Sequence, residues 1–231
     1  MPEANVFRWI EGRGWIVLSG RLSDVHGDAG DIRSLVLARS AADGGVACVS
    51  LSGDPQGAEK LLEDLESLGA PAGFIVDVFS EDDNTIQKRL ADAGVIVIDS
   101  APDAESARSA LLGAPIDGIQ EAFVNGAIVL LEGNSLSPFG SWLIKNDGSV
   151  VGGAKWLDSA VILPSATQLA MQVREVFELE PAAYALGIAD GSALALGPDG
   201  EVQVWGRGQV AVALGSTYTT QDDARDASKE E

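Results

Sequence analysis

A serine in a tight polar segment, Ser135, has the setting best suited to covalent chemistry. It lies in Gly133-Asn134-Ser135-Leu136-Ser137, directly after the apolar run 127–131. A serine on a sharp turn between a buried strand and a helix is presented to substrate, and N–H groups at the helix start can stabilise a developing oxyanion. A serine that only caps the helix is the alternative reading. The segment therefore predicts either a nucleophile or a cap at Ser135.

A serine nucleophile needs a base, and the chain has a single histidine, His26. It follows the apolar run 14–20, in a loop that also contains Asp24 and Asp28. Loops after parallel strands gather at one edge of a sheet, so His26 and Ser135 are predicted to face one crevice. A histidine that is simply solvated in its loop is the alternative.

Acidic and glycine-rich segments can mark metal or cofactor sites. The pairs Asp24/Asp28 and Asp82/Asp83 form no recognised ligand set, so solvated carboxylates are expected. Glycine pairs at 44–45 and 152–153 lack the lysine of a phosphate-binding loop and the spacing of a dinucleotide-binding motif. We therefore expect no metal and no cofactor.

The elements that position these residues alternate between buried strands and helices. Strands are predicted at the apolar runs 14–20, 46–51, 74–79, 94–98 and 127–131. Helices are predicted at 31–42, 54–68, 82–93 and 103–125, the last with a break at 113–115. Runs that are apolar on both faces belong in the middle of a parallel sheet. The sequence predicts a flavodoxin-like, three-layer α/β/α sandwich with a mostly parallel central sheet.

The C-terminal third has a different pattern. A helix is expected at 165–177, followed by short segments at 183–188, 192–196, 201–205 and 209–214. These predict antiparallel hairpins, one of them closed by the turn Pro198-Asp199-Gly200. We expect a single domain over residues 1–215 and a flexible acidic tail over 216–231.

Composition limits the classes of partner. The 231 residues include 35 acidic and 15 basic side chains, a formal net charge of −20 that disfavours nucleic acid and anionic membranes. No apolar stretch is long enough to span a bilayer. The one cysteine, Cys48, lies in a predicted buried strand and has no partner for an internal disulfide. A cytoplasmic protein is expected.

Three segments together resemble the family of dipeptidase E and cyanophycinase, which are serine peptidases on a glutamine-amidotransferase-like fold. The elbow Gly-Thr-Ser-Ala-Gly-Ala of that family is similar to 133–138. The family segment Gly-Ile-Asp-Glu-x-Thr-Ala and the hairpin after it are similar to 187–194 and 202–210, and the family strand before a glycine pair is similar to 91–98. The resemblance covers residues 14–214 in order. It implies the fold of that family and a nucleophile position at Ser135.

Two departures from the family bear on activity. The family's glycine pair, which supplies oxyanion amides, is replaced by Asp99-Ser100, and a carboxylate has the wrong sign beside an oxyanion. The family's histidine base lies in an Asp-x-His-Phe segment, but the corresponding stretch 160–166 has no histidine. His26 is then the surrogate base to consider for Ser135.

The resulting hypothesis is a catalytically degenerate peptidase-like protein that acts in binding or assembly, as a homodimer or higher homo-oligomer. Its crevice would bind a peptide or small polar ligand through a set of residues near the serine: Gly133, Asn134, Leu136, Asp99 and Ser100. One alternative is an active serine peptidase on acidic-residue peptides, with Ser135 and a relocated base. Another is an assembly subunit whose crevice has filled with side chains such as Leu136 and Phe139.

Overall fold

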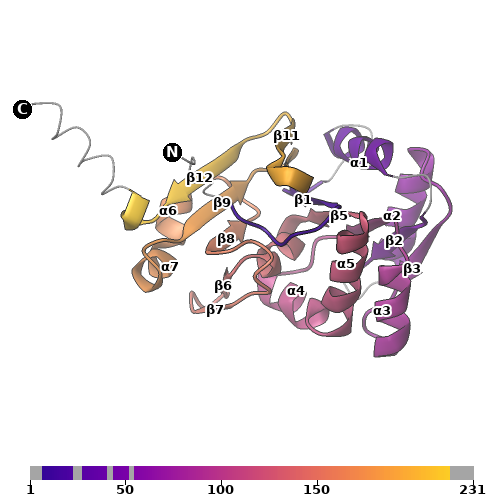
Figure 1. Ribbon diagram of the computed structural model, residues 1–231, viewed down its shortest axis with the longest axis horizontal. Helices are drawn as coiled ribbons and strands as arrows, with labels where there is room; N and C mark the ends of the chain where they lie inside the picture. Colours follow the sequence, from indigo (N-terminus) through magenta and orange to yellow (C-terminus); the bar gives the residue numbers. More distant parts are fainter. Residues whose placement is uncertain (1–6, 23–27, 41–43, 52–54, 219–231) are drawn as a thin grey trace, which may run out of the picture.

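A computed structural model describes residues 7–22, 28–40, 44–51 and 55–218. The strands among these residues form two sheets (Figure 1). The first has seven strands in the order β11-β10-β1-β5-β4-β2-β3. Its parallel strands are β1 (Trp15–Ser19), β2 (Val46–Val49), β3 (Gly73–Val76), β4 (Val95–Ile98) and β5 (Ile128–Glu132). The antiparallel strands β10 (Ser192–Leu196) and β11 (Val202–Gly206) complete one edge.

Helices cover both faces of the first sheet. On one face, α1 (Asp28–Arg39) and α2 (Pro55–Ser67) share a buried cluster with β2 and β4, which includes Ile32, Val36, Leu61 and Leu65. The other face packs against α3 (Asp83–Ala91), α4 (Ala104–Leu111) and α5 (Ala114–Asn125). The predicted sandwich with a mostly parallel central sheet is confirmed. The central strands are apolar on both faces, since helices cover each face of the sheet.

The helix boundaries follow local capping chemistry. The Asp82 side chain accepts a hydrogen bond from the N–H of Thr85 at 3.1 Å, which starts α3, and Asp103 accepts from Ser106 at 2.7 Å, which starts α4. The helix predicted at 103–125 is two helices, interrupted by Gly113 at a φ of +95°. That interruption lies at the predicted break.

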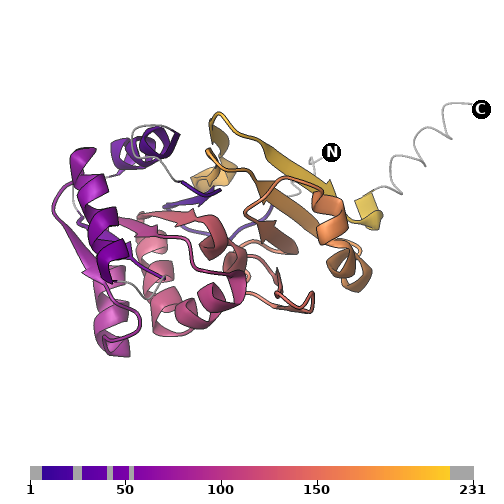
Figure 2. The ribbon, with the colours of Figure 1, turned by 180° about the vertical axis from the view of Figure 1, so that it is seen from behind.

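The second sheet was not predicted. It has the order β12-β9-β8-β6-β7 and comprises β6 (Trp142–Ile144), β7 (Val150–Gly152), β8 (Ala160–Leu163), β9 (Tyr184–Ile188) and β12 (Val210–Leu214). One of its faces shares the main core with the first sheet. Its other face is covered by α6 (Leu169–Gln172) and α7 (Arg174–Leu179), which replace the single helix predicted at 165–177. Figure 2, from behind, shows this sheet at the end of the molecule opposite helices α1–α3.

The C-terminal hairpin prediction is correct in part. Strands β10 and β11 form an antiparallel hairpin, and its turn η2 (Pro198–Gly200) has positive φ at Asp199 and Gly200. Strand β9 instead lies in the second sheet, antiparallel to β12 and parallel to β8. The assignment of 1–215 to one domain stays a prediction, and residues 219–231 of the expected tail lie outside the described residues.

A buried 3-10 helix, η1 (Gly133–Phe139), connects the two sheets directly after β5. Phe139 packs edge-on against Trp156, with ring centroids 4.9 Å apart, and Trp156 also contacts Phe123 of α5. Leu136 and Phe139 are fully buried. The segment around Ser135 is therefore fixed by the core on both sides.

Candidate functional site

A crevice of about 350 Å³ lies at the carboxyl ends of the parallel strands, where the predicted serine site was expected. It is polar, and its charged and hydroxyl-bearing lining residues are Arg21, Arg33, Lys60, Asp64, Asp99, Ser100 and Glu132. Strands β4 and β5 end at Ile98 and Glu132, so the residues that follow them reach the crevice. A pocket is thus present at this edge, and Leu136 and Phe139 are buried in the core and do not line it.

A buried ion pair forms the floor of the crevice. Arg33 of α1 donates from Nε to Oε1 of Glu132 at 2.9 Å and from Nη2 to Oε2 at 2.8 Å. The two side chains are 6% and 4% exposed, and Asp64 of α2 lies 3.6 Å from Arg33. Burial raises the pKa of the Glu132 carboxyl, and the bond to Arg33 opposes that rise. Arg33 is therefore committed to its two carboxylates.

Asp99, directly after β4, is held by hydrogen bonds from the loop after β2. Leu51 donates its N–H to Oδ1 at 2.6 Å, and the Ser50 hydroxyl donates to Oδ2 at 2.9 Å. Burial raises the pKa of the Asp99 carboxyl, and these two bonds lower it in part. Asp99 thus links the ends of the neighbouring strands β2 and β4 beside the crevice.

Ser135 lies in the core and does not line the crevice. Its side chain is fully buried. The hydroxyl donates to the carbonyl of Glu132 at 2.9 Å and lies 3.3 Å from the carbonyl of Ile98. Both acceptors are backbone groups at the ends of β4 and β5. In this arrangement the Ser135 hydroxyl ties two strands to η1.

The turn after β5 has its unusual conformation at Gly133, where φ is +57°. A nucleophile elbow holds its reactive side chain on the strained residue between strand and helix, and here that residue has no side chain. A Cβ built on Gly133 would lie 2.3 Å from Ser100 Oγ and 2.7 Å from Ser100 Cβ. The Ser100 hydroxyl also accepts the N–H of Asn134 at 3.2 Å. Ser100 therefore fills the space of an elbow side chain and covers the amide that follows it.

The structure places the other predicted residues as follows. The Asn134 side chain donates to the carbonyls of Ala101 and Pro102, both at 3.0 Å, so it braces the segment after β4. Leu136 belongs to the core. His26 and Asp24 lie outside the described residues. Gly133, Asn134, Asp99 and Ser100 are thus brought together, whereas Ser135 and Leu136 face the core.

Cys48 offers no alternative nucleophile. The thiol is buried in β2, and burial raises its pKa to about 12. Among the described residues, no group of three or more His, Cys, Asp or Glu side chains could hold a metal ion. Within those same residues, no helix has the length and apolar character needed to cross a membrane.

Asp99 predicts a specific pH dependence of stability. Its raised folded pKa, against about 3.9 unfolded, means that its contribution to stability is fully present below about pH 3.9 and is lost as pH rises through the folded value. Asp99→Asn keeps an acceptor for Leu51 and removes this titration. Urea denaturation from about pH 4 to 7 is expected to show a smaller loss of stability than in the native protein. The exposed Asp92→Asn is the control, and equal pH profiles for native protein and Asp99→Asn would contradict the prediction.

Sequence reasoning missed Arg33 and Glu132. Glu132 is the carboxylate that ends the apolar run of β5, and Arg33 lies between the core residues Ile32 and Val36 on α1. A charge in each of two buried patterns was the available signal, because buried charges are normally paired. The partners are 99 residues apart, so the sequence alone did not identify the pair.

Solved structures of peptidases share this architecture. A crystal structure of a peptidase from an acI-B1 Actinobacterium matches with a TM-score of 0.72 and 14% sequence identity, over 89% of this chain and 93% of that chain. A putative peptidase E protein from Listeria monocytogenes EGD-e matches with a TM-score of 0.60 and 13% identity, over 84% of this chain and 99% of that chain. This chain has a peptidase E-like fold. No protein-family model and no curated protein matches the sequence.

The peptidase E-like fold confirms the architecture implied by the sequence resemblance. At 13–14% identity, the likeness transfers the arrangement of strands and helices and leaves activity to the residues of the site. In this chain the segments after β4 and β5 meet at one crevice.

Proposed function

We propose that this chain is a binding protein on a peptidase E-like fold that does not hydrolyse peptides. The observation that carries the proposal is the fully buried Ser135 hydroxyl, which donates to the backbone of Glu132. A nucleophile must reach a substrate carbonyl and pass its proton to a base. Ser135 does neither in this arrangement, and the described lining of the crevice contains no histidine.

The rest of the elbow supports the same proposal. The positive-φ position is Gly133, and Ser100 occupies the adjacent space and accepts the Asn134 N–H. A substrate oxyanion would have to displace the Ser100 hydroxyl from that amide. The nearby Asp99 carboxylate, when ionised, would repel such an oxyanion.

The crevice suits a small zwitterionic ligand such as a short peptide. Arg21 and Lys60 are exposed cations in its lining and can receive a carboxylate. Asp64, whose side chain is 22% exposed, can receive an ammonium group. A cavity lined by positive and negative side chains favours a ligand that carries a positive and a negative group. The expected gain in binding free energy is modest, because these side chains are exposed or partly exposed and solvent screens each ion pair.

The alternative is an active serine peptidase that uses Ser135 with a relocated base such as His26. The two solved structures compared above are a peptidase and a putative peptidase E protein. This alternative requires η1 to move so that the Ser135 hydroxyl leaves its backbone acceptors. It also requires a base from residues outside the described part of the crevice.

Labelling with a fluorophosphonate probe tests the proposal. We expect no labelling of the folded native protein beyond that of Ser135→Ala, because a hydroxyl without a base is a weak nucleophile. Ser137→Ala is the matched control, since Ser137 is also a buried serine of η1. Labelling that is lost in Ser135→Ala and retained in Ser137→Ala would overturn the proposal in favour of the peptidase.

The same preparation, incubated with aspartyl-leucine, separates binding from hydrolysis. Calorimetric binding of the intact dipeptide, weakened when its ends are blocked, supports a zwitterion site. Release of free leucine supports the peptidase. The absence of both binding and release would reject this ligand class. The labelling experiment would then still decide whether Ser135 is reactive.

We further propose that the chain forms a homodimer in the cytoplasm. Strands β11 and β12 form edges of the two sheets and expose apolar side chains at Val202, Val204, Val212 and Leu214. These suit a homodimer contact through strand edges, which light scattering would detect as twice the chain mass. The buried free thiol of Cys48 fits a reducing cytoplasm.

A further inference from the structure

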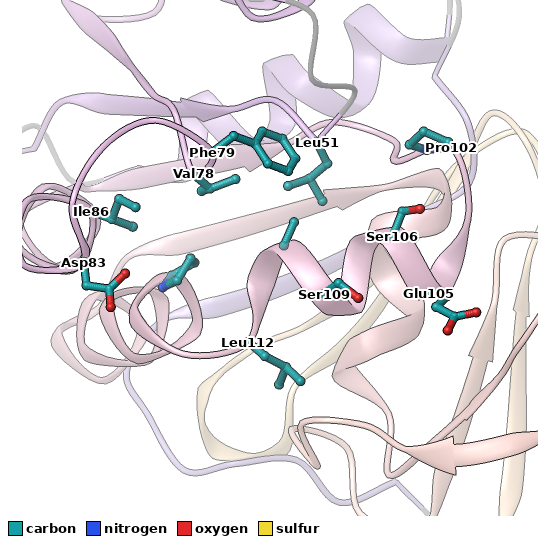
Figure 3. A pocket seen from close by; sticks show the side chains of 12 residues that line it. Leu51, Val78, Phe79, Asp83, Ile86, Pro102, Glu105, Ser106, Ser109 and Leu112 are labelled. Carbon is teal, nitrogen blue, oxygen red and sulfur yellow. The ribbon is translucent and has the colours of Figure 1, made fainter.

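A second pocket, separate from the crevice, lies between the loop after β3 and helices α3 and α4 (Figure 3). Its volume is about 650 Å³, within the range of small-molecule sites. Pro102 lines this pocket, whereas Asp99 and Ser100, three and two residues earlier, line the crevice. The segment after β4 therefore separates the two cavities.

The pocket has an apolar floor and exposed apolar walls. Leu51 and Ile86 are buried at 3% and 2% exposure. Phe79 and Leu112, which also line the pocket, are 59% and 42% exposed. In Figure 3 these two side chains lie on opposite sides of the pocket. Large apolar side chains exposed around a concavity are typical of a surface that a ligand covers.

The charge around the pocket is negative. Asp83 and Glu105 line it, and Figure 3 shows them at its two ends, while none of its lining residues is basic. The Glu105 carboxylate pairs with Lys145 at 3.0 Å. Asp83 has no hydrogen bond or ion pair to its side chain from the described residues. One carboxylate at the rim is thus available to a ligand.

The starts of α3 and α4 do not reverse this charge. Both helices begin at the pocket, and each helix N-terminus carries a partial positive charge of about one half. Each also carries a capping aspartate, Asp82 or Asp103, and an acidic residue in its first turn. The sum is net negative, in a protein whose net charge is −20.

We propose that this pocket binds a small organic cation with an apolar body, such as an arylalkylammonium compound. The apolar body would cover Leu51, Ile86 and Leu112, which removes apolar surface from water. The ammonium group would lie near Asp83 and within reach of the Phe79 ring, whose face attracts cations. The site shares no lining residue with the crevice, so this inference goes beyond the proposed function.

Calorimetric titration of the native protein with three probes of one shape tests the inference. The probes are 2-phenylethylammonium, the neutral 2-phenylethanol and the anionic phenylacetate. An exposed ion pair and a cation–π contact together favour the ammonium over the alcohol by roughly five- to tenfold. Phenylacetate is expected to bind most weakly, because the Asp83 carboxylate repels it.

Two variants assign the effect to this pocket. Asp83→Asn is expected to reduce the preference for the ammonium by about threefold, and Phe79→Leu, which keeps an apolar side chain without an aromatic face, by a similar factor. Asp92→Asn, at the other end of α3, is the matched control and should leave the preference unchanged. Equal affinity for the three probes, no binding, or equal effects of Asp83→Asn and Asp92→Asn would each overturn the inference.

Discussion

Replacement of Arg33 by methionine is expected to lower the free energy of unfolding by about 3–5 kcal/mol at neutral pH, because a buried carboxylate loses its counter-charge. Glu132 is 4% exposed, and both its oxygens accept hydrogen bonds from Arg33. Urea denaturation followed by circular dichroism measures the loss. Arg39→Met, on the exposed part of the same helix, is the control. It loses a hydrogen bond to Gln203 and cation–π contacts with Trp15 and Trp205, so it should cost about 1–2 kcal/mol.

Two further results would identify the uncompensated charge as the cause. Without Arg33, burial leaves Glu132 with a folded pKa above the unfolded value of about 4.3, so stability should return as pH falls toward that value. The double variant Arg33→Met, Glu132→Leu should regain most of the loss at neutral pH, because an apolar pair can replace a buried ion pair. A loss no larger than that of Arg39→Met would contradict the prediction.

Replacement of Gly133 by serine is expected to cost about 2–5 kcal/mol, from a left-handed backbone conformation and an overpacked side chain. The φ of +57° accounts for the first part, and the approach of the new Cβ to Ser100 accounts for the second. Rotation of the Ser100 hydroxyl cannot relieve the clash, since Ser100 Cβ itself would lie 2.7 Å away.

A double-mutant cycle with Ser100→Gly isolates the contact. In that background the nearest remaining neighbour of a Cβ on Gly133 is Arg21 Cγ at 3.4 Å, an ordinary contact, so Gly133→Ser should cost about 1–2 kcal/mol. Gly148→Ser is the control, because Gly148 has a φ of +85° and no atom within 4 Å of an added Cβ. An equal cost of Gly133→Ser in both backgrounds would show that Ser100 does not fill the elbow.

The parallel core of the fold could be predicted because its signal is local. Strands β2 and β4 are continuous apolar runs, β5 is one up to Glu132, and helical segments of suitable length separate them. The second sheet gave no such signal, because β6 and β7 have three residues each and are partly exposed. The pairing of β6 with β8 depends on contacts that no short window contains.

The candidate site was predicted in place but not in detail. The segments at Asp99 and Gly133 meet because they follow neighbouring parallel strands, which is a rule of topology. Which residue of 133–137 takes the positive φ depends on where β5 ends, and a shift of two residues separates Gly133 from Ser135. The Arg33–Glu132 pair depends on how α1 docks on the sheet, which no local pattern encodes.

The pairing of β1 with β10 has a consequence for synthesis. Residues 16–19 and 193–196 form adjacent strands, so one side of β1 stays without a partner until residues 193–196 have left the ribosome. The parallel strands β2–β5 emerge much earlier and can assemble around the other side of β1. During that interval the nascent chain exposes an open strand edge, the type of surface that recruits chaperones or other unfinished chains.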